Sequence, residues 1–316
     1  MGKWVDQTSA YITRMSIHVY KNQFVFNSQH YADNFGEIIS IDMESMTNNW
    51  VINHNFFRTG LIGLDEKVFK IDHKSDRIEY YEIDLLSQEV SMVYSNPPVQ
   101  YGQFVEAQEP FFYKTEDDSF AMLVTTSDES GFILENYNIT KQEMIWRISL
   151  TEFNDLHQYS DYVLGPVDVQ IFDDYIIVNS LSHFSVRRLE DQELLYIRYR
   201  TPSANVTKPV VGRGVITDST SKLYCYAIEN GMPIWAREDY QDGIWVGHNY
   251  GREIYKDYLF HYVPINIHTG DAEWVRLDTW GTLDLDFEGT PGIDKEKDHL
   301  YYINSRTKTL YRVAMP

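Results

Sequence analysis

The chain has 316 residues, a formal net charge of −20 and an aromatic content of 15%. Because the phosphate backbone of a nucleic acid repels an acidic surface, this charge excludes a nucleic-acid partner and favours a basic protein partner. The single cysteine, Cys225, excludes an internal disulfide and is typical of a reducing compartment.

The N-terminal region has no apolar run long enough for a signal peptide or a membrane helix. We therefore expect a cytoplasmic protein without a membrane partner, present as a monomer or in a hetero-complex. No Ser/Gly-rich or low-complexity stretch marks a boundary, so residues 1–316 are expected to form a single domain.

One pattern recurs along the chain: an alternating apolar strand, a short polar turn, and a second strand with a large anchor residue. It is clearest in KLYCYAIENGMPIWARE at 222–238, where Asn230 and Gly231 suit a turn. An apolar residue precedes the anchor by seven positions in four copies, Ile139/Trp146, Leu189/Tyr196, Ile228/Trp235 and Ile267/Trp274. The step is nine in two copies, Ile41/Trp50 and Ile83/Met92. A single hairpin of this size cannot bury both faces, so the copies are expected to stack on one another.

Taken in chain order, the copies predict seven units of about the length of a WD40-class propeller blade, roughly 40–45 residues. The first should contain the strands Ser9–Ser16, Ile17–Phe26, Gly36–Asp42 and Asn49–Asn53. The next four are expected at Leu61–Tyr94, Phe111–Leu150, Val167–Tyr199 and up to Glu238, and the sixth ends near Leu277. The last strands are His299–Ile303 and Thr309–Ala314, and Lys3-Trp4-Val5 is expected to pair with them. The sequence therefore predicts an all-β fold, a single seven-bladed β-propeller closed by its N-terminal strand.

The copies resemble the PQQ-like (quinoprotein-like) β-propeller repeat, in which a strand with Ala-Leu-Asp leads through Thr-Gly to a strand ending in Trp. The matching residues are Ala227-Ile228, Gly231 and Trp235, and Ile265–Gly270 with Trp274. The resemblance also extends to WD40-like propellers, although the Trp-Asp dipeptide of that family is absent. The quinoprotein enzymes use adjacent cysteines beside their cofactor, so this resemblance implies no cofactor here and fits the family's assembly scaffolds better.

The six long connections between the units should lie on one rim of such a propeller, and they are acidic and aromatic together. Trp245 and Trp280 are the two tryptophans outside the anchor positions and Trp4. Loop aromatics beside carboxylates are typical of protein interfaces. The predicted partner-binding residues are Tyr159, Asp161, Asp239, Asp242, Trp245, His248, Tyr250, Trp280, Asp284 and Asp286.

Catalytic and metal motifs are weak. The stretch from Asp284 to Gly289 resembles the start of a calcium loop, but Lys295 occupies the position that requires a bidentate glutamate. His54, His157 and His248 lie in three different connections without a ligand spacing. No nucleophile elbow or phosphate loop is present, so no catalytic residue, metal or cofactor is predicted.

Two functions remain open at this stage. The first is a non-catalytic propeller that binds a basic protein partner through the acidic, aromatic loop face, for example as an inhibitor or immunity-type protein. The alternative is a carbohydrate-active or carbohydrate-binding propeller with a site in the central channel, because propellers host such sites and carboxylates are plentiful.

Overall fold

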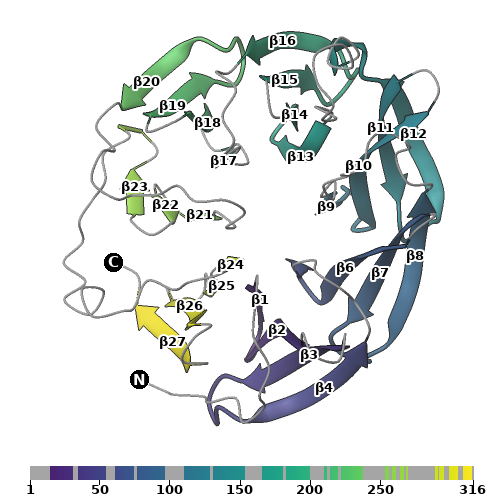
Figure 1. Cartoon of the computed structure of the whole chain (residues 1–316), viewed down its shortest axis with the longest axis vertical. Coiled ribbons are helices and arrows are strands. Elements are labelled where there is room, and N and C mark those ends of the chain that lie inside the picture. Colours follow the sequence, from purple (N-terminus) through teal and green to yellow (C-terminus); the bar gives the residue numbers. More distant parts are fainter. Residues whose placement is uncertain are drawn as a thin grey trace. The chain divides into compact units, whose positions relative to one another are not determined.

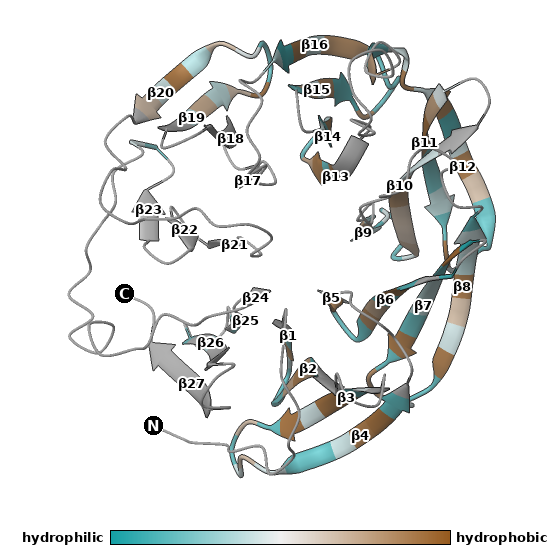
Figure 2. Cartoon of the chain, viewed as in Figure 1, coloured by the Kyte–Doolittle hydropathy of each residue, from teal (hydrophilic) through white to brown (hydrophobic). Residues whose placement is uncertain are grey.

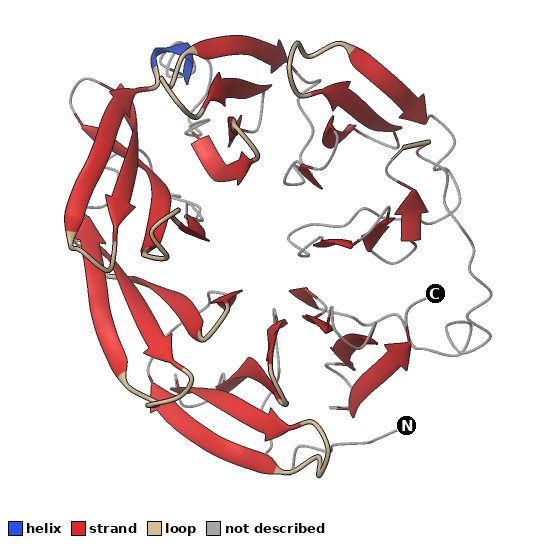
Figure 3. Cartoon of the chain, turned by 180° about the vertical axis from the view of Figure 1, so that it is seen from behind, coloured by secondary structure: helices blue, strands red, loops and turns tan. Residues whose placement is uncertain are grey.

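The computed structural model describes residues 15–30, 35–54, 61–74, 77–96, 110–128, 131–153, 166–180, 183–199, 210–211, 214–219, 222–237, 253–255, 258–260, 264–266, 268–269, 289–290, 292–294, 299–304 and 309–314. The regular elements among these residues are strands, apart from a short helical turn at 151–153, which is blue in Figure 3. The prediction of an all-β fold is therefore confirmed.

The described strands form seven sheets, in which strands consecutive in sequence lie side by side (Figure 1). Sheets 1 and 2 contain β1 (Met15–Tyr20), β2 (Gln23–His30), β3 (Phe35–Asp42) and β4 (Asn48–His54), then β5 (Ile62–Leu64), β6 (Lys67–His73), β7 (Ile78–Asp84) and β8 (Val90–Asn96). Sheets 3 and 4 contain β9 (Phe111–Lys114), β10 (Phe120–Asp128), β11 (Gly131–Asn138) and β12 (Glu143–Ser149), then β13 (Pro166–Phe172), β14 (Tyr175–Ser180), β15 (His183–Arg188) and β16 (Leu194–Tyr199).

The later sheets follow the same order. Sheet 5 contains β17 (Val210–Val211), β18 (Gly214–Ser219), β19 (Lys222–Ala227) and β20 (Pro233–Arg237). Sheet 6 contains β21 (Glu253–Tyr255), β22 (Tyr258–Phe260) and β23 (Pro264–Asn266), and sheet 7 contains β25 (Gly292–Asp294), β26 (His299–Asn304) and β27 (Thr309–Ala314). The short strand β24 (Gly289–Thr290) pairs in parallel with β1.

Contacts divide the chain into two compact units. The first unit contains residues 1–95, 249–264 and 273–316, and the second contains residues 96–248 and 265–272. The expectation of a single domain stays a prediction.

In the first unit, neighbouring sheets bury their faces against each other. Val25 and Ile38 of sheet 1 pack on Val68 and Ile83 of sheet 2, and the anchor Trp50 joins this cluster. These side chains are hydrophobic and buried because each sheet is covered on both faces; Figure 2 shows the hydropathy along the strands.

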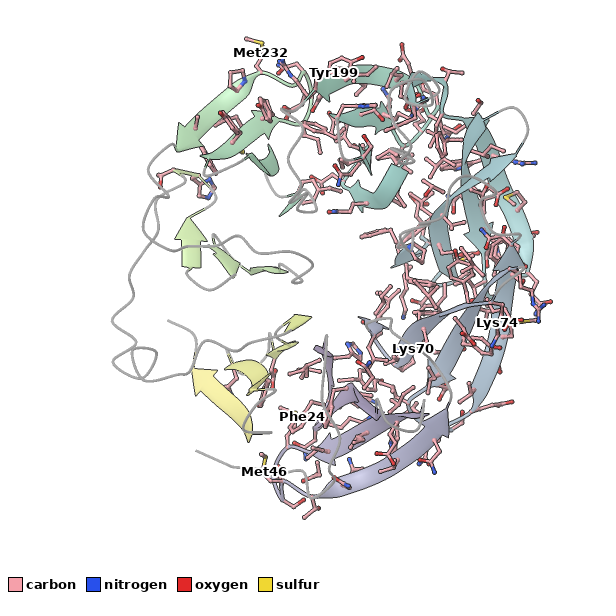
Figure 4. The ribbon with its side chains drawn as sticks, in the orientation of Figure 1. Phe24, Met46, Lys70, Lys74, Tyr199 and Met232 are labelled. Carbon is pink, nitrogen blue, oxygen red and sulfur yellow. The ribbon has the colours of Figure 1, made fainter. Side chains whose placement is uncertain are left out.

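The first and last sheets of the chain also meet in this unit. The ring of Phe24 in β2 lies 5.7 Å from that of Tyr301 in β26, and both residues belong to one buried cluster. Phe24 is labelled in Figure 4. The predicted strand Lys3-Trp4-Val5 lies outside the described residues, so its pairing with the last sheet remains a prediction.

The second unit repeats this packing. Sheets 3 and 4 share a cluster that includes Leu134, Val169 and the anchor Trp146. Sheets 4 and 5 share another, in which Ile228 packs with Phe184 and the anchor Tyr196. The anchors Trp50, Trp146 and Tyr196 therefore pack on the neighbouring copy, as the repeat pattern predicts, whereas the anchor Met92 is 56% exposed.

The turn between the third and fourth strands has one geometry in sheets 1 to 5. A residue with a left-handed backbone, φ between 56° and 68°, precedes the anchor by four positions in every case: Met46, Gln88, Gln142, Gln192 and Gly231. The first turn residue caps the loop where it is Asp or Asn; Asp42 Oδ1, for example, accepts hydrogen bonds from the amides of Glu44 and Ser45 at 3.0 and 2.7 Å.

The turns correct two sequence interpretations. The steps of seven and nine are one step, because Met43 and Leu85, seven residues before their anchors, occupy the buried position that Ile139 and Ile228 occupy elsewhere. The predicted strand Ile17–Phe26 is two strands: the chain reverses at Lys21, which has φ 51°, and Tyr20 pairs with Gln23. Alternation of apolar residues on both sides of this tight turn concealed it.

Candidate functional site

In a sheet of four antiparallel strands, the first strand begins and the fourth strand ends at the same edge, which we call the loop end. In sheet 4 the register fixes this end, because Pro166 pairs with Ser180 and His183 pairs with Tyr199. The connections 154–165 and 200–209 both attach there. The loop end of sheet 4 is thus one described part of the surface that the sequence predicts to bind a partner.

A buried ion pair joins sheet 4 to the helical turn that follows the last strand of sheet 3. Glu152, in the helical turn after β12, accepts hydrogen bonds from Arg187 Nη2 at 2.6 Å and from Arg187 Nε at 3.1 Å. The side chains are 1% and 9% exposed, and the hydroxyl of Ser185 also donates to Glu152 at 3.0 Å. Paired geometry of this kind holds both groups rigidly.

An aromatic stack begins at Phe153, next to Glu152 in sequence, and reaches the surface at the loop end of sheet 4. The rings of Phe153 and His183 stack with centroids 4.4 Å apart, and the ring of His183 lies 5.4 Å from that of Tyr199. Tyr199 is 75% exposed, the most exposed large hydrophobic side chain of the described residues, and Figure 4 marks its position at the end of β16. The sheet thus presents a rigidly supported ring to solvent.

Ser180 and His183 also lie close together: Ser180 Oγ is 3.4 Å from His183 Nδ1, and their other two hydrogen bonds are those of a turn. The amide of His183 donates to Ser180 Oγ at 3.2 Å, and the Ser180 hydroxyl donates to the His183 carbonyl at 2.9 Å. Both residues are at most 1% exposed. The carboxylate of Glu152 is committed to Arg187, so the arrangement supports binding by Tyr199 better than nucleophilic chemistry.

Sheet 2 contains a different feature, the buried Lys70. It follows the left-handed residue of the first turn by five positions, as do Phe26, Leu123 and Val178 in sheets 1, 3 and 4. Those three are fully buried apolar residues, whereas Lys70 is a lysine that is 1% exposed. Burial lowers the pKa of Lys70 to about 7, while the neighbouring Asp72 acts to raise it. Figure 4 labels this side chain.

The predicted site residues cannot be compared with the geometry, because all of them lie outside the described residues: Tyr159, Asp161, Asp239, Asp242, Trp245, His248, Tyr250, Trp280, Asp284 and Asp286. Tyr159 and Asp161 belong to the connection that follows Phe153. His54 is the last residue of β4, whereas His157 and His248 also fall outside the described part.

Sequence reasoning missed Tyr199 and the residues beneath it. Tyr199 is the last residue of its strand, and one residue separates it from Thr201-Pro202. This nearby proline is a signal that Tyr199 borders a loop. The exposure of Tyr199 could not be deduced, because the sequence does not say which face of the strand is covered. Tyr196, on the other face, packs against sheet 5, and the Tyr196 hydroxyl donates to the Ala227 carbonyl at 3.1 Å.

Among the residues that the structure describes, no group of three or more His, Cys, Asp or Glu side chains is placed to hold a metal ion. The same residues include no helix long and apolar enough to cross a membrane.

Some solved structures are similar to this chain. The chain is similar to BamB from Moraxella catarrhalis, with a TM-score of 0.55, 12% identity, and coverage of 94% of this chain and 84% of that one. It is also similar to the β-propeller domain of Cps50 (Swd1) from Myceliophteria thermophila, with a TM-score of 0.44, 8% identity, and coverage of 96% and 84%. No protein-family model and no curated protein matches the sequence. The likeness to BamB, a PQQ-like β-propeller, confirms the loose resemblance to propeller repeat proteins at the level of the fold.

Proposed function

We propose that this chain is a non-catalytic protein-binding propeller of seven blades, closed by its N-terminal strand, whose loop face binds a basic protein partner. The concrete form that we favour is a cytoplasmic inhibitor or immunity-type protein that covers a cationic toxin or enzyme. The observation that carries the proposal is Tyr199, an aromatic ring 75% exposed at the loop end of sheet 4.

The support under Tyr199 is what suits it to binding. An exposed aromatic ring contributes most to an interface when it is already held in place, since less side-chain entropy is lost on binding. The stack on His183 and Phe153 and the ion pair between Glu152 and Arg187 supply that rigidity. The connection 154–165, which ends at the loop end of sheet 4, carries the predicted Tyr159 and Asp161.

Charge indicates the kind of partner. The net charge of −20 attracts basic proteins over long range and accelerates their association. Carboxylates around aromatic anchors would then pair with lysine and arginine on the partner. Cys225 is free, 1% exposed, and has its pKa raised to about 12 by burial, which is compatible with a reducing compartment.

The test is affinity purification of the tagged full-length chain from its native cell, with identification of the retained proteins. We expect one dominant basic protein that is released by salt, because screening weakens pairing between exposed charges. Tyr199→Ala, and Trp245→Ala combined with Asp242→Lys, should each reduce its recovery. Ile145→Ala, on the exposed edge of β12, is the matched control and should leave recovery unchanged.

An acidic dominant partner, or equal recovery with all variants, would refute the proposal. Retention of a glycan by the purified protein, lost with Tyr199→Ala, would favour the carbohydrate-binding alternative instead.

A further inference from the structure

The fourth strand of each of sheets 1 to 5 is an edge strand among the described residues, because it pairs with the third strand alone. An edge strand exposes backbone N–H and C=O groups that can pair with another extended chain. Proteins usually block such edges with charged residues or proline.

Three of the five edge strands here are blocked in this way. β12 carries Glu143 and Arg147, β16 carries Arg198, and β20 contains a proline and an arginine. By contrast, β4 (NNWVINH) and β8 (VSMVYSN) contain no Asp, Glu, Lys, Arg or Pro. In a chain with 47 acidic residues, two edge strands without a charged residue are unusual.

The strand β4 is held firmly and is exposed on its other side. Trp50 and Ile52 pack against sheet 2, which fixes the strand in place. Val51, between them, is 42% exposed, and Asn49 and Asn53 are exposed as well. An incoming strand would therefore meet a preformed, neutral edge, so little ordering of this protein would accompany binding.

The turn before β4 differs from the turn before β8 at its first aspartate, Asp42 or Asp84, although an exposed glutamate, Glu44 or Glu89, lies in both turns. Hydrogen bonds from the Ser45 amide and hydroxyl, with those from Glu44 and Asn22, hold the pKa of Asp42 below its usual range although burial acts to raise it. Glu44 is exposed, and within the described ranges neither carboxylate forms an ion pair. The equivalent Asp84 before β8 is instead paired with Lys67 at 2.8 Å. The β4 edge thus begins beside uncompensated negative charge.

From the neutral edge and this charge, we propose that β4 binds an extended segment of a partner protein by strand addition. The segment is antiparallel to β4, has apolar and hydroxyl residues in its centre, and carries a basic residue at its C-terminal end. In the antiparallel orientation this end lies beside Glu44. A second copy of the chain is a poor occupant, because two molecules with a charge of −20 repel each other.

Hydrogen exchange on the full-length chain tests this surface with two synthetic probes. The first is an acetylated, amidated peptide of alternating threonine and valine that ends in two lysines; the second has the lysines at its start. We expect the first peptide to slow exchange of the amides of residues 48–54 and to leave β12 unchanged. The second should bind about threefold more weakly, the scale of one exposed charge pair.

Two variants test whether the preference between the peptides depends on the charge of Glu44. Glu44→Lys should abolish the difference between the peptides, whereas Glu143→Lys, beside the edge of β12, should preserve it. The inference is overturned if neither peptide protects β4 at millimolar concentration, if β12 is protected equally, or if the second peptide binds better. Sedimentation of the chain alone adds a last check, because a dimer abolished by Val51→Lys would make a second copy the occupant. These outcomes are independent of the loop face, whose residues the probes do not contact.

Discussion

Replacement of the buried Lys70 by methionine should stabilise the protein, and the gain should depend on pH. Methionine preserves the length of the side chain but removes the ammonium group, and sheets 1, 3 and 4 place apolar residues at this position. The pKa of Lys70 is lowered from 10.5 to about 7 because burial removes the charged form from water. A shift of this size corresponds to about 5 kcal/mol, which is the upper limit for the gain.

The direction of the pH dependence follows from linkage. Between pH 7 and 10.5 the unfolded chain retains a proton on Lys70 that the folded chain has released, so the stability of the native protein rises with pH in this range. The destabilisation is fully present below about pH 7 and disappears near pH 10.5. The advantage of Lys70→Met should therefore be largest at pH 6.5 and should decrease as the pH rises.

The assay is urea denaturation of both proteins at pH 6.5, 8.5 and 10. Lys67→Met, on the same strand, is the control, and we expect it to change the free energy of unfolding in the opposite direction. Although burial lowers the pKa of Lys67, hydrogen bonds to Asp84 and Glu82 raise it overall, so loss of this ammonium should destabilise the fold. Lower stability of Lys70→Met at pH 6.5, or a difference that does not vary with pH, would refute the reasoning.

The remaining predictions concern close contacts and the buried ion pair, and urea denaturation checks each of them. A Cβ at Gly63 would lie 2.0 Å from the ring of His18, so Gly63→Ala should destabilise the protein by about 1–3 kcal/mol; an unchanged midpoint would show that the ring moves freely. Gly231→Ala should have a similar effect, because φ is +68° and a tyrosine ring would lie 2.7 Å from the new atom. Arg187→Met should destabilise by about 3–5 kcal/mol, since it leaves Glu152 buried without its cation, and a loss below 1 kcal/mol would indicate that water replaces the guanidinium.

Much of the fold could be predicted because the repeat has a strong local signal. A large anchor such as Trp146 follows a turn at fixed spacing, and alternating apolar residues on both faces, as in the strand with Cys225, require a covered sheet. The first turn was missed at Lys21, although the polar run Lys21-Asn22-Gln23 interrupts the alternation and Asn22 favours a turn. The apolar residues on both sides were interpreted as one strand.

Much less of the candidate site could be predicted. Tyr199 and Tyr196 have the same residue type in one strand, and only the pleat and the neighbouring sheet decide which is exposed. Lys70 likewise cannot be distinguished from a surface lysine until β6 is known to be buried on both faces. The acidic, aromatic connections are visible in the sequence, but whether they converge depends on the placement of the sheets, which periodicity does not encode.

The most direct test of the proposed function is the dissociation constant of the retained partner, measured at several salt concentrations for the wild type and for the Trp245→Ala, Asp242→Lys variant. We predict binding that weakens with salt and a loss of at least thirtyfold in the variant, equivalent to about 2 kcal/mol, the scale of an interface hot spot. Affinity that is unchanged in the variant and insensitive to salt would contradict a basic partner bound at the loop face.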